Sequence, residues 1–282
     1  MPAAAKRTNG AVASTSSAAD RRPVTVPDFL SARSRGVRLT MLTAYDYTMA
    51  RLLDAAGVDG ILVGDSLGMV VQGNEHSLSV TLDEMIYHTR CVSRGVRRSL
   101  LVADMPFMSY QVSPQQALEN AGRLVKEGGA HAVKLEGGVR SEASIAAIAA
   151  ADIPVMGHIG LTPQSVRRLG GFRVQRDEAK LLDDARATEQ AGAFALVIEC
   201  VPSELARKIT ESVSIPTIGI GAGPACDGQI LVTPDLLGLY EDVRPRFVKQ
   251  YAELGREVLR AVEAFCREVQ ERKFPAAEHQ FR

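Results

Sequence analysis

The stretch GILVGDS, residues 60–66, carries no charge over its first five residues and then ends on a carboxylate and a hydroxyl, Asp65 and Ser66. The simplest explanation is that one of these two side chains caps a following helix, as Asp and Ser often do. The same ending recurs at other apolar runs of the chain, however. An apolar run without alternation indicates a strand that is buried on both faces of a sheet, so the recurring polar endings must be explained by where such strands end.

Eight apolar runs of this kind alternate with segments of helical periodicity from residue 36 onward. They cover residues 37–44, 60–64, 100–104, 131–136, 153–158, 194–199, 216–221 and 229–232. Alternation of strands and helices predicts a parallel sheet. Because a closed (β/α)8 barrel typically takes roughly 250 residues, the 282-residue chain favours an α/β fold of the (β/α)8 TIM barrel type over an open doubly wound sheet.

Two of the runs repeat one another. GAHAVKLE (129–136) and GAFALVIE (192–199) both read Gly-Ala-x-Ala-apolar-x-apolar-Glu. Each begins where a helical segment stops and ends on a carboxylate. An ordinary turn between a helix and a strand explains the first half of this pattern, but it does not explain the terminal Glu.

The barrel does not account for the two ends of the chain. Residues 1–25 are rich in Ala, Ser and Thr and nearly free of large apolar side chains, which predicts a disordered tail; a transit peptide is the alternative, but the segment lacks an amphipathic face. Residues 26–282 are predicted to form one barrel domain with a C-terminal helical extension. Within it, residues 246–274 have helical spacing, and we expect part of them to form the eighth barrel helix and the rest a lid or an arm that contacts another subunit.

The composition excludes several classes of partner. Thirty-three basic residues balance thirty-three acidic ones, so the sequence predicts neither a nucleic-acid surface nor binding to an anionic membrane. The four cysteines have no CxxC spacing, which argues against a thiolate zinc site and suits a reducing compartment. No run approaches the ~20 apolar residues needed to cross a bilayer, and we expect a cytoplasmic protein.

Polar side chains gather at the predicted strand ends. They are Asp65 and Ser66 after the second strand, Asp104 after the third, Lys134 and Glu136 in the fourth, His158 in the fifth and Glu199 in the sixth. Active sites of (β/α)8 barrels are built at the carboxyl ends of the strands. These residues are therefore expected to converge on one mouth, where Asp65 is better interpreted as a ligand than as a helix cap.

Four carboxylates held close together need a cation or a proton between them. Oxygen ligands with a single His indicate a hard octahedral ion such as Mg²⁺, held by one or two carboxylates, with water and substrate completing the shell. Zinc is less favoured, because no His-x-x-x-His spacing occurs. The sequence predicts a magnesium site.

Three features stay open between a structural and a functional role. Lys134 either pairs with an acid or holds a substrate carboxylate, and we favour the second. His158, in GHIGLTPQ, is either a structural or a catalytic histidine. The glycine-rich stretch 219–229 either cradles an anion or only permits tight turns, and it lacks the Lys-Ser/Thr of a P-loop.

Seven blocks of the sequence, in order, resemble one enzyme family. They are MLTAYD (41–46), VGDSLGMVVQG (63–73), ADMPFMSY (103–110), VKLEGG (133–138), GHIGLTPQ (157–164), ECVP (199–202) and PTIGIGAGPACDGQILV (216–232). Over about residues 25–265 the chain resembles ketopantoate hydroxymethyltransferases (3-methyl-2-oxobutanoate hydroxymethyltransferases), and no departure is seen at a functional position.

The resemblance implies a barrel of the phosphoenolpyruvate/pyruvate superfamily that transfers a hydroxymethyl group from 5,10-methylenetetrahydrofolate to 3-methyl-2-oxobutanoate, giving 2-dehydropantoate for pantothenate biosynthesis. It also implies Mg²⁺ on Asp65 and Asp104, with Glu136 supporting the waters of the metal. Ser66 and Lys134, with the metal-binding Asp65 and Asp104, would contact the keto acid, and Glu199 would be the base. Members of the family form large homo-oligomers, commonly decamers.

Two other functions are alternatives to this one. A metal-dependent C–C lyase of the isocitrate lyase type is the nearest alternative, but such enzymes carry a Cys-Gly-His catalytic loop, and this triplet does not occur in the sequence. A catalytically silent anion-binding protein that uses residues 219–229 would leave the four carboxylates at the strand ends unexplained.

Overall fold

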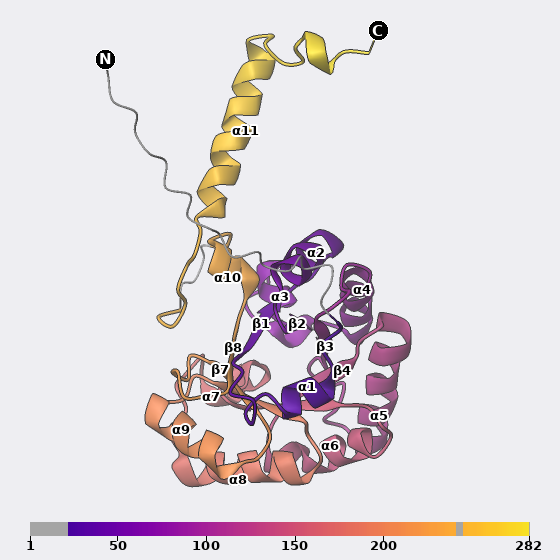
Figure 1. Ribbon diagram of the computed structural model, residues 1–282, viewed down its shortest axis with the longest axis vertical. Coiled ribbons are helices and arrows are strands. Elements are labelled where there is room, and N and C mark those ends of the chain that lie inside the picture. Colours follow the sequence, from indigo (N-terminus) through magenta and orange to yellow (C-terminus); the bar gives the residue numbers. More distant parts are fainter. Residues whose placement is uncertain (1–21, 241–244, 282) are drawn as a thin grey trace, which may run out of the picture.

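Eight parallel strands close into a barrel in the computed structural model, which describes residues 22–240 and 245–281 (Figure 1). The strands are β1 (Leu39–Thr43), β2 (Gly60–Val63), β3 (Leu100–Asp104), β4 (Ala132–Glu136), β5 (Val155–Gly160), β6 (Ala195–Glu199), β7 (Thr217–Ile220) and β8 (Gly228–Leu231). They pair in chain order, and β8 closes against β1. Each strand overlaps one predicted apolar run, so the predicted fold class is confirmed.

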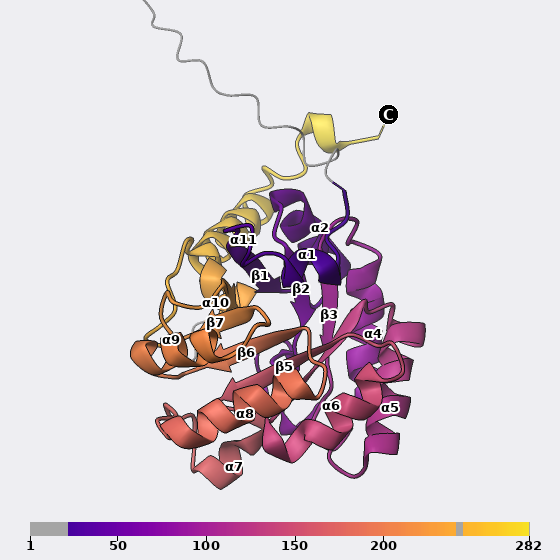
Figure 2. The same cartoon turned by 60° about the horizontal axis from the view of Figure 1, so that its bottom comes forward.

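Helices connect the strands and cover the outside of the barrel. They are α1 (Val26–Leu30), α2 (Tyr47–Ala56), α3 (Leu67–Val70), α4 (Leu82–Ser93), α5 (Pro114–Arg123), α6 (Glu142–Ala149), α7 (Val166–Leu169), α8 (Glu178–Gln190), α9 (Ser203–Ser212), α10 (Thr233–Leu237) and α11 (Leu254–Gln270). Figure 2 shows α4, α5, α6 and α8 around the strands. The start of α5 follows from its sequence: the Ser113 side chain accepts a hydrogen bond from the N–H of Gln116, and Pro114 occupies the first turn.

The barrel interior changes from apolar to charged along the strands. Side chains two residues apart on a strand point to the same side. On β3, Leu100 and Val102 belong to an apolar cluster inside the barrel, and Asp104, at the carboxyl end of the strand, is next on the same side. On β4, Ala132 belongs to that cluster, and Lys134 and Glu136 follow it. The alternation of side chains along each strand thus places these charged side chains at the carboxyl ends of the strands, above a packed apolar core.

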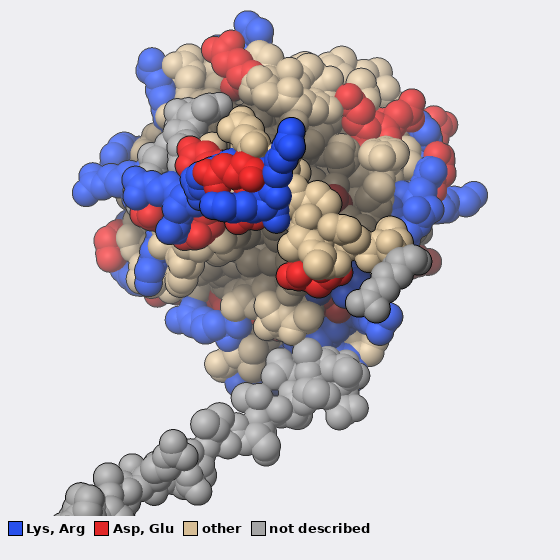
Figure 3. Space-filling model, turned by 90° about the horizontal axis from the view of Figure 1, so that it is seen from above, with Lys and Arg blue, Asp and Glu red and all other residues tan. Residues whose placement is uncertain are grey.

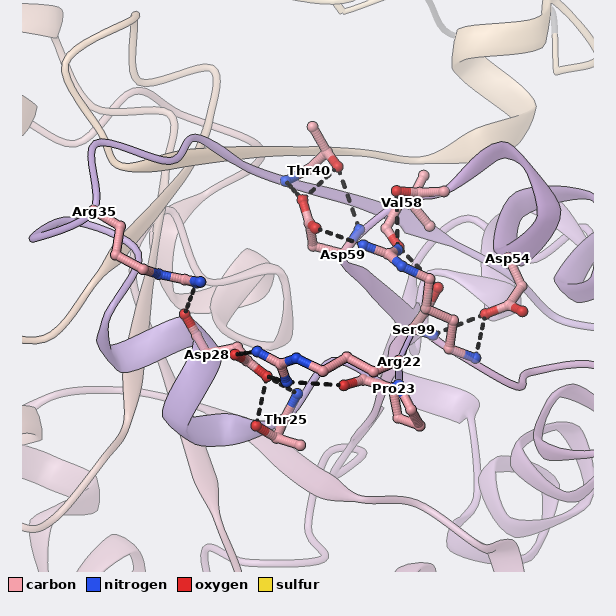
Figure 4. A network of polar contacts seen from close by, with 12 residues as sticks. Arg22, Pro23, Thr25, Asp28, Arg35, Thr40, Asp54, Val58, Asp59 and Ser99 are labelled. Carbon is pink, nitrogen blue, oxygen red and sulfur yellow. Dashed lines mark hydrogen bonds and ion pairs between the residues drawn. The ribbon is translucent and has the colours of Figure 1, made fainter. Parts of the chain in front are cut away.

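The opposite end of the barrel is held by polar contacts before the strands begin (Figure 4). Asp54 accepts hydrogen bonds from the backbone N–H groups of Arg98 and Ser99, just before β3. Asp59 accepts from the N–H and hydroxyl of Thr40 in β1 and pairs with Arg98 at 3.3 Å. These contacts tie the starts of β1, β2 and β3 together, at the end of the barrel that serves stability rather than chemistry.

The predicted disordered tail lies outside the described residues up to position 21. The next residues contact the barrel: the N–H of Val24 donates to the carbonyl of Arg98 at 2.7 Å, and Arg22 pairs with Asp28 at 2.6 Å. Thr25 is the N-cap residue of α1 and takes part in a capping box with Asp28. Contacts with the barrel therefore begin ahead of α1, within the described residues.

The C-terminal segment departs from the expected arrangement. We expected part of residues 246–274 to form the eighth barrel helix, and this prediction is wrong within the described chain. The five-residue α10 follows β8, whereas α11 projects away from the barrel and has no buried residue (Figure 1). Its apolar residues Val258, Val262, Phe265 and Val269 form a stripe at helical spacing, and each is 45–53% exposed.

Candidate active site

The barrel brings the predicted site residues to one mouth. Strand register places Asp104 opposite Lys134, Glu136 opposite His158, and Gly160 opposite Glu199. Asp65, Asp104, Lys134, Glu136 and His158 are 2–6% exposed, whereas Ser66 and Glu199 are partly exposed. A solute entering the mouth would therefore meet Ser66 and Glu199 at an accessible surface, with charged groups buried behind them.

Neither Asp65 nor Ser66 caps the helix that follows it. Ser66 stands at the N-cap position of α3 but makes no capping hydrogen bond, and its hydroxyl lies 2.8 Å from the hydroxyl of Tyr45. Asp65 Oδ2 accepts a hydrogen bond of 2.9 Å from Gln164 Nε2, and the Asp65 N–H donates to Asp104 Oδ2 at 3.0 Å. The polar ending of GILVGDS is thus turned into the mouth.

Lys134 is the only Lys or Arg among the described buried residues. Its Nζ lies 2.9 Å from Asp104 Oδ1 and 3.3 Å from His158 Nδ1. An ammonium group has three donors, so these two contacts leave one donor for a further acceptor. The two roles considered for Lys134, pairing with an acid and holding a carboxylate, are therefore compatible.

Burial and crowding shift the ionisation of the acids. Burial raises the pKa of Asp65 to about 7, and repulsion by Asp104 adds to this increase. Burial, with repulsion by Asp65, raises the pKa of Glu136 well above its ordinary value. Burial disfavours the charged form of Lys134, but Asp104, Asp65 and Glu136 together outweigh it and raise the Lys134 pKa. The acids of the mouth therefore lie too close together to ionise without a proton or a cation beside them, which is the condition under which a cation can take the place of a proton.

His158 links the lysine to the acid that ends β6. Its Nδ1 faces Lys134, and its Nε2 lies 3.1 Å from Glu199 Oε2. Burial, with repulsion by Lys134, lowers the His158 pKa well below its ordinary value, so the ring is neutral. Because an ammonium group only donates, Nδ1 is the acceptor and the ring proton is on Nε2, facing Glu199. Burial also raises the pKa of Glu199 to about 7.

The structure adds residues that were not predicted as site residues. Gln164 contacts Asp65 through its side chain and Glu136 through its backbone N–H. Tyr110 donates its hydroxyl to Gln164 Oε1, and Tyr45 meets Ser66. Each stands in a block quoted above, but none ends a strand. Their presence in those blocks was the only signal in the sequence, because the contacts themselves join distant parts of the chain.

The glycine-rich stretch 219–229 covers the end of β7, the turn that follows it and the start of β8. Gly221 and Gly223 have positive φ angles of 62° and 78°. A Cβ at Gly221 would lie 2.8 Å from the Phe247 ring, and one at Gly223 would lie 2.3 Å from Ser203 Oγ. Backbone conformation and close packing thus account for these two glycines without an anion.

The acids fit a hard cation held by few protein ligands. Asp65 and Asp104 offer carboxylate oxygens from neighbouring strands, joined by the hydrogen bond between the Asp65 N–H and Asp104 Oδ2. Within residues 22–240 and 245–281, no group of three His, Cys, Asp or Glu side chains is arranged around a metal position. Mg²⁺ is commonly bound through one or two carboxylates, with water and substrate completing its octahedron. The two carboxylates of Asp65 and Asp104 are therefore enough to hold Mg²⁺.

Relatives of the chain agree on one activity. Residues 23–277 match the family model described as ketopantoate hydroxymethyltransferase. The 3-methyl-2-oxobutanoate hydroxymethyltransferase of Clostridium novyi is 59% identical over 262 residues, which are 92% of this chain and 95% of that protein. The enzyme of the same name from Pelobacter propionicus is 56% identical over 264 residues, covering 93% and 98% of the two chains.

Solved structures share the architecture at low sequence identity. A phosphoenolpyruvate phosphomutase from Streptomyces platensis subsp. rosaceus has a TM-score of 0.60 at 17% identity, covering 88% of each chain. 2,3-Dimethylmalate lyase, of the phosphoenolpyruvate mutase/isocitrate lyase superfamily, has a TM-score of 0.59 at 18% identity, covering 90% and 92%. These two show the fold alone.

No helix in the described part of the chain is both long and apolar enough to cross a membrane. The family match over residues 23–277, the two curated relatives and the mouth described above together show that the chain belongs to the ketopantoate hydroxymethyltransferase family.

Proposed function

We propose that the protein transfers a hydroxymethyl group from 5,10-methylenetetrahydrofolate to 3-methyl-2-oxobutanoate and so forms 2-dehydropantoate for pantothenate biosynthesis. The observation that carries this proposal is the mouth itself. There, Asp65, Asp104 and Glu136 are buried around a single ammonium group, with the partly exposed Glu199 beside them. Relatives 56–59% identical to the chain bear the name of this activity.

Asp65 and Asp104 would hold Mg²⁺, and Glu136 would support its waters. Asp104 keeps its ion pair to Lys134, and Asp65 keeps its hydrogen bond from Gln164, so both carboxylates are oriented before anything binds. When bound, the ion would polarise the keto oxygen of the substrate and offset the charge that develops there during proton removal.

Ser66 and Lys134 would receive the carboxylate of the keto acid. The third donor of the Lys134 ammonium is available for this contact, and the hydroxyl of Ser66 is fixed by Tyr45 at 2.8 Å. A 2-oxo acid has its carboxylate and keto oxygens on adjacent carbons. Anchoring the carboxylate therefore also determines where C3 lies relative to the acids of the mouth.

Glu199 would remove the proton from C3. Its pKa of about 7, raised by burial, places it near the pH at which a general base works best. His158 Nε2 lies 3.1 Å from Glu199 Oε2, so the imidazole stands beside this carboxylate. The electron pair of the broken C–H bond then forms the new C–C bond to the one-carbon unit. Both C–N bonds of the methylene group break, so that tetrahydrofolate leaves. One water supplies the hydroxyl oxygen and the two N–H protons of tetrahydrofolate, and the proton taken by Glu199 passes to the new hydroxyl group.

A product assay tests the activity directly. The protein is incubated with Mg²⁺, 3-methyl-2-oxobutanoate and 5,10-methylenetetrahydrofolate, and the acids are analysed by mass spectrometry. We expect the keto acid to gain one CH₂O unit, and to gain none when the folate is omitted. A parallel incubation contains 2,3-dimethylmalate or a methylisocitrate. Cleavage of that acid, without any CH₂O gain by 3-methyl-2-oxobutanoate, would instead support the lyase alternative.

We also propose that the protein is a cytoplasmic homo-oligomer of decameric size. The apolar stripe of α11, which no part of the described chain covers, supports assembly. Basic and acidic side chains are interspersed on the face from which this helix projects (Figure 3). In addition, a groove of about 880 Å³ lies beside β7 and β8, and Leu39, Val174 and Phe247 contribute to its lining. A second copy of this chain would bury the stripe of α11, and it has the same stripe and groove as apolar surfaces of its own.

Removing residues 255–282 should reduce the size of the particle in sedimentation velocity, because the stripe of α11 would be lost. A milder variant, Val262→Ser with Phe265→Ser, should act in the same direction. Arg260→Ser with Arg267→Ser, on the opposite face of the helix, is the matched control and should sediment as wild type. An unchanged particle after the truncation would rule out this role for α11.

A further inference from the structure

Gln164 stands at the meeting point of several polar contacts. It lies in the 3₁₀ turn Pro163–Ser165 after β5 and is 7% exposed. Its Nε2 donates to Asp65 Oδ2 at 2.9 Å and to the carbonyl of Met105 at 3.0 Å. Its Oε1 accepts from the hydroxyl of Tyr110 at 2.8 Å and from Gln111 Nε2 at 3.0 Å. An amide has two donors and two strong acceptor sites, so all four are used.

Tyr110 fixes the direction of this amide. Its hydroxyl accepts from the N–H of Glu136 at 3.1 Å, so its single proton is free to point at Gln164 Oε1. Tyr110 is 2% exposed, and burial, with repulsion by Glu136, raises its pKa far above neutrality, so this proton stays in place. Turning the amide over would set its oxygen against the Asp65 carboxylate and the Met105 carbonyl. The observed orientation is therefore strongly preferred.

The two ends of Gln164 serve two different acids. The side chain holds one oxygen of Asp65, which fixes the rotation of that carboxylate. The backbone N–H donates to Glu136 Oε2 at 3.1 Å. One residue after β5 thus connects the acid that follows β2 with the acid that ends β4. Neither contact depends on a bound substrate.

We infer that Gln164, oriented by Tyr110, is a positioning residue that presets the Asp65 carboxylate for the metal ion and the keto acid. The inference rests on the proposed function, because it takes Asp65 to be a metal ligand. Residues that hydrogen-bond to a metal ligand typically change metal affinity by about 10–100-fold when they are removed. The expected loss lies in metal affinity rather than in the fold, because Gln164→Met preserves the length of the side chain.

The test is a calorimetric Mg²⁺ titration without substrate, accompanied by thermal unfolding. We expect Gln164→Met to raise the Mg²⁺ Kd about 10–100-fold. Tyr110→Phe, which keeps the ring, should raise it less, because Gln111 still orients the amide. Ser144→Ala is the matched control: the Ser144 hydroxyl donates to the carbonyl of Tyr110 at 3.0 Å, so its loss disturbs the same segment but should leave Mg²⁺ affinity unchanged.

The variant Asp65→Asn distinguishes failure of the metal assignment from failure of the positioning role of Gln164. If Asp65→Asn loses Mg²⁺ while Gln164→Met and Tyr110→Phe bind it as wild type does, the metal site stands and the positioning role is refuted. If Asp65→Asn also binds Mg²⁺ as wild type does, Asp65 is not a metal ligand, and the inference fails with that assignment. Should Gln164→Met not fold, Tyr110→Phe decides alone, and a wild-type Kd in that variant overturns the inference.

Discussion

Replacing Asp104 by Asn is expected to reduce Mg²⁺ affinity by more than the roughly 10–100-fold that follows the loss of a supporting contact. The substitution keeps the shape of the side chain but removes the charge that holds a hard cation. It also leaves Lys134 without its counter-charge at 2.9 Å, so a positive group would stand next to the ion. Asp65→Asn should act in the same direction, because the second carboxylate of the pair is then lost.

Calorimetric titration with Mg²⁺ measures this effect directly. Asp235→Asn is a matched control, since Asp235 is a half-buried acid on α10 whose pKa is raised by burial to about 6, and it has no proposed ligand role. The wild-type affinity should also fall as the pH drops below about 7, because Asp65 must lose its proton to bind the metal and its pKa is about 7 without metal. Wild-type affinity in both Asp65→Asn and Asp104→Asn would refute the metal assignment.

The strands and the acids at their ends could be predicted from the sequence because both are local signals. A run such as LLVAD identifies a buried strand and its terminal carboxylate together. Convergence then follows from the topology of a closed parallel barrel. This reasoning brought Asp104, Glu136 and Glu199 to one mouth, as the structure shows.

The contacts between distant segments could not be predicted in this way. Gln164 reaches Asp65 across 99 positions of the chain, and no periodicity reports which side chains of two loops will meet. The helix α11 shows a different limit. Its apolar stripe correctly indicated a helix, but an amphipathic pattern does not say which surface covers it. The expectation of an eighth barrel helix was wrong for that reason.

Replacing Glu199 by Gln is expected to lower the rate of proton removal from C3 by about 10²–10⁴-fold, the usual contribution of a general base. Gln preserves the size of the side chain, but it cannot accept a proton. Because Glu199 must be ionised and its pKa is about 7, the wild-type rate should fall as the pH is lowered below that value.

Exchange of the C3 proton of 3-methyl-2-oxobutanoate with D₂O, followed by proton NMR in the absence of folate, tests the central claim most directly. It isolates proton removal from transfer of the one-carbon unit. We predict exchange by the wild-type protein that requires Mg²⁺ and decreases about 10²–10⁴-fold in Glu199→Gln. Exchange at the wild-type rate in Glu199→Gln, or no exchange by the wild-type protein with Mg²⁺ present, would contradict the account.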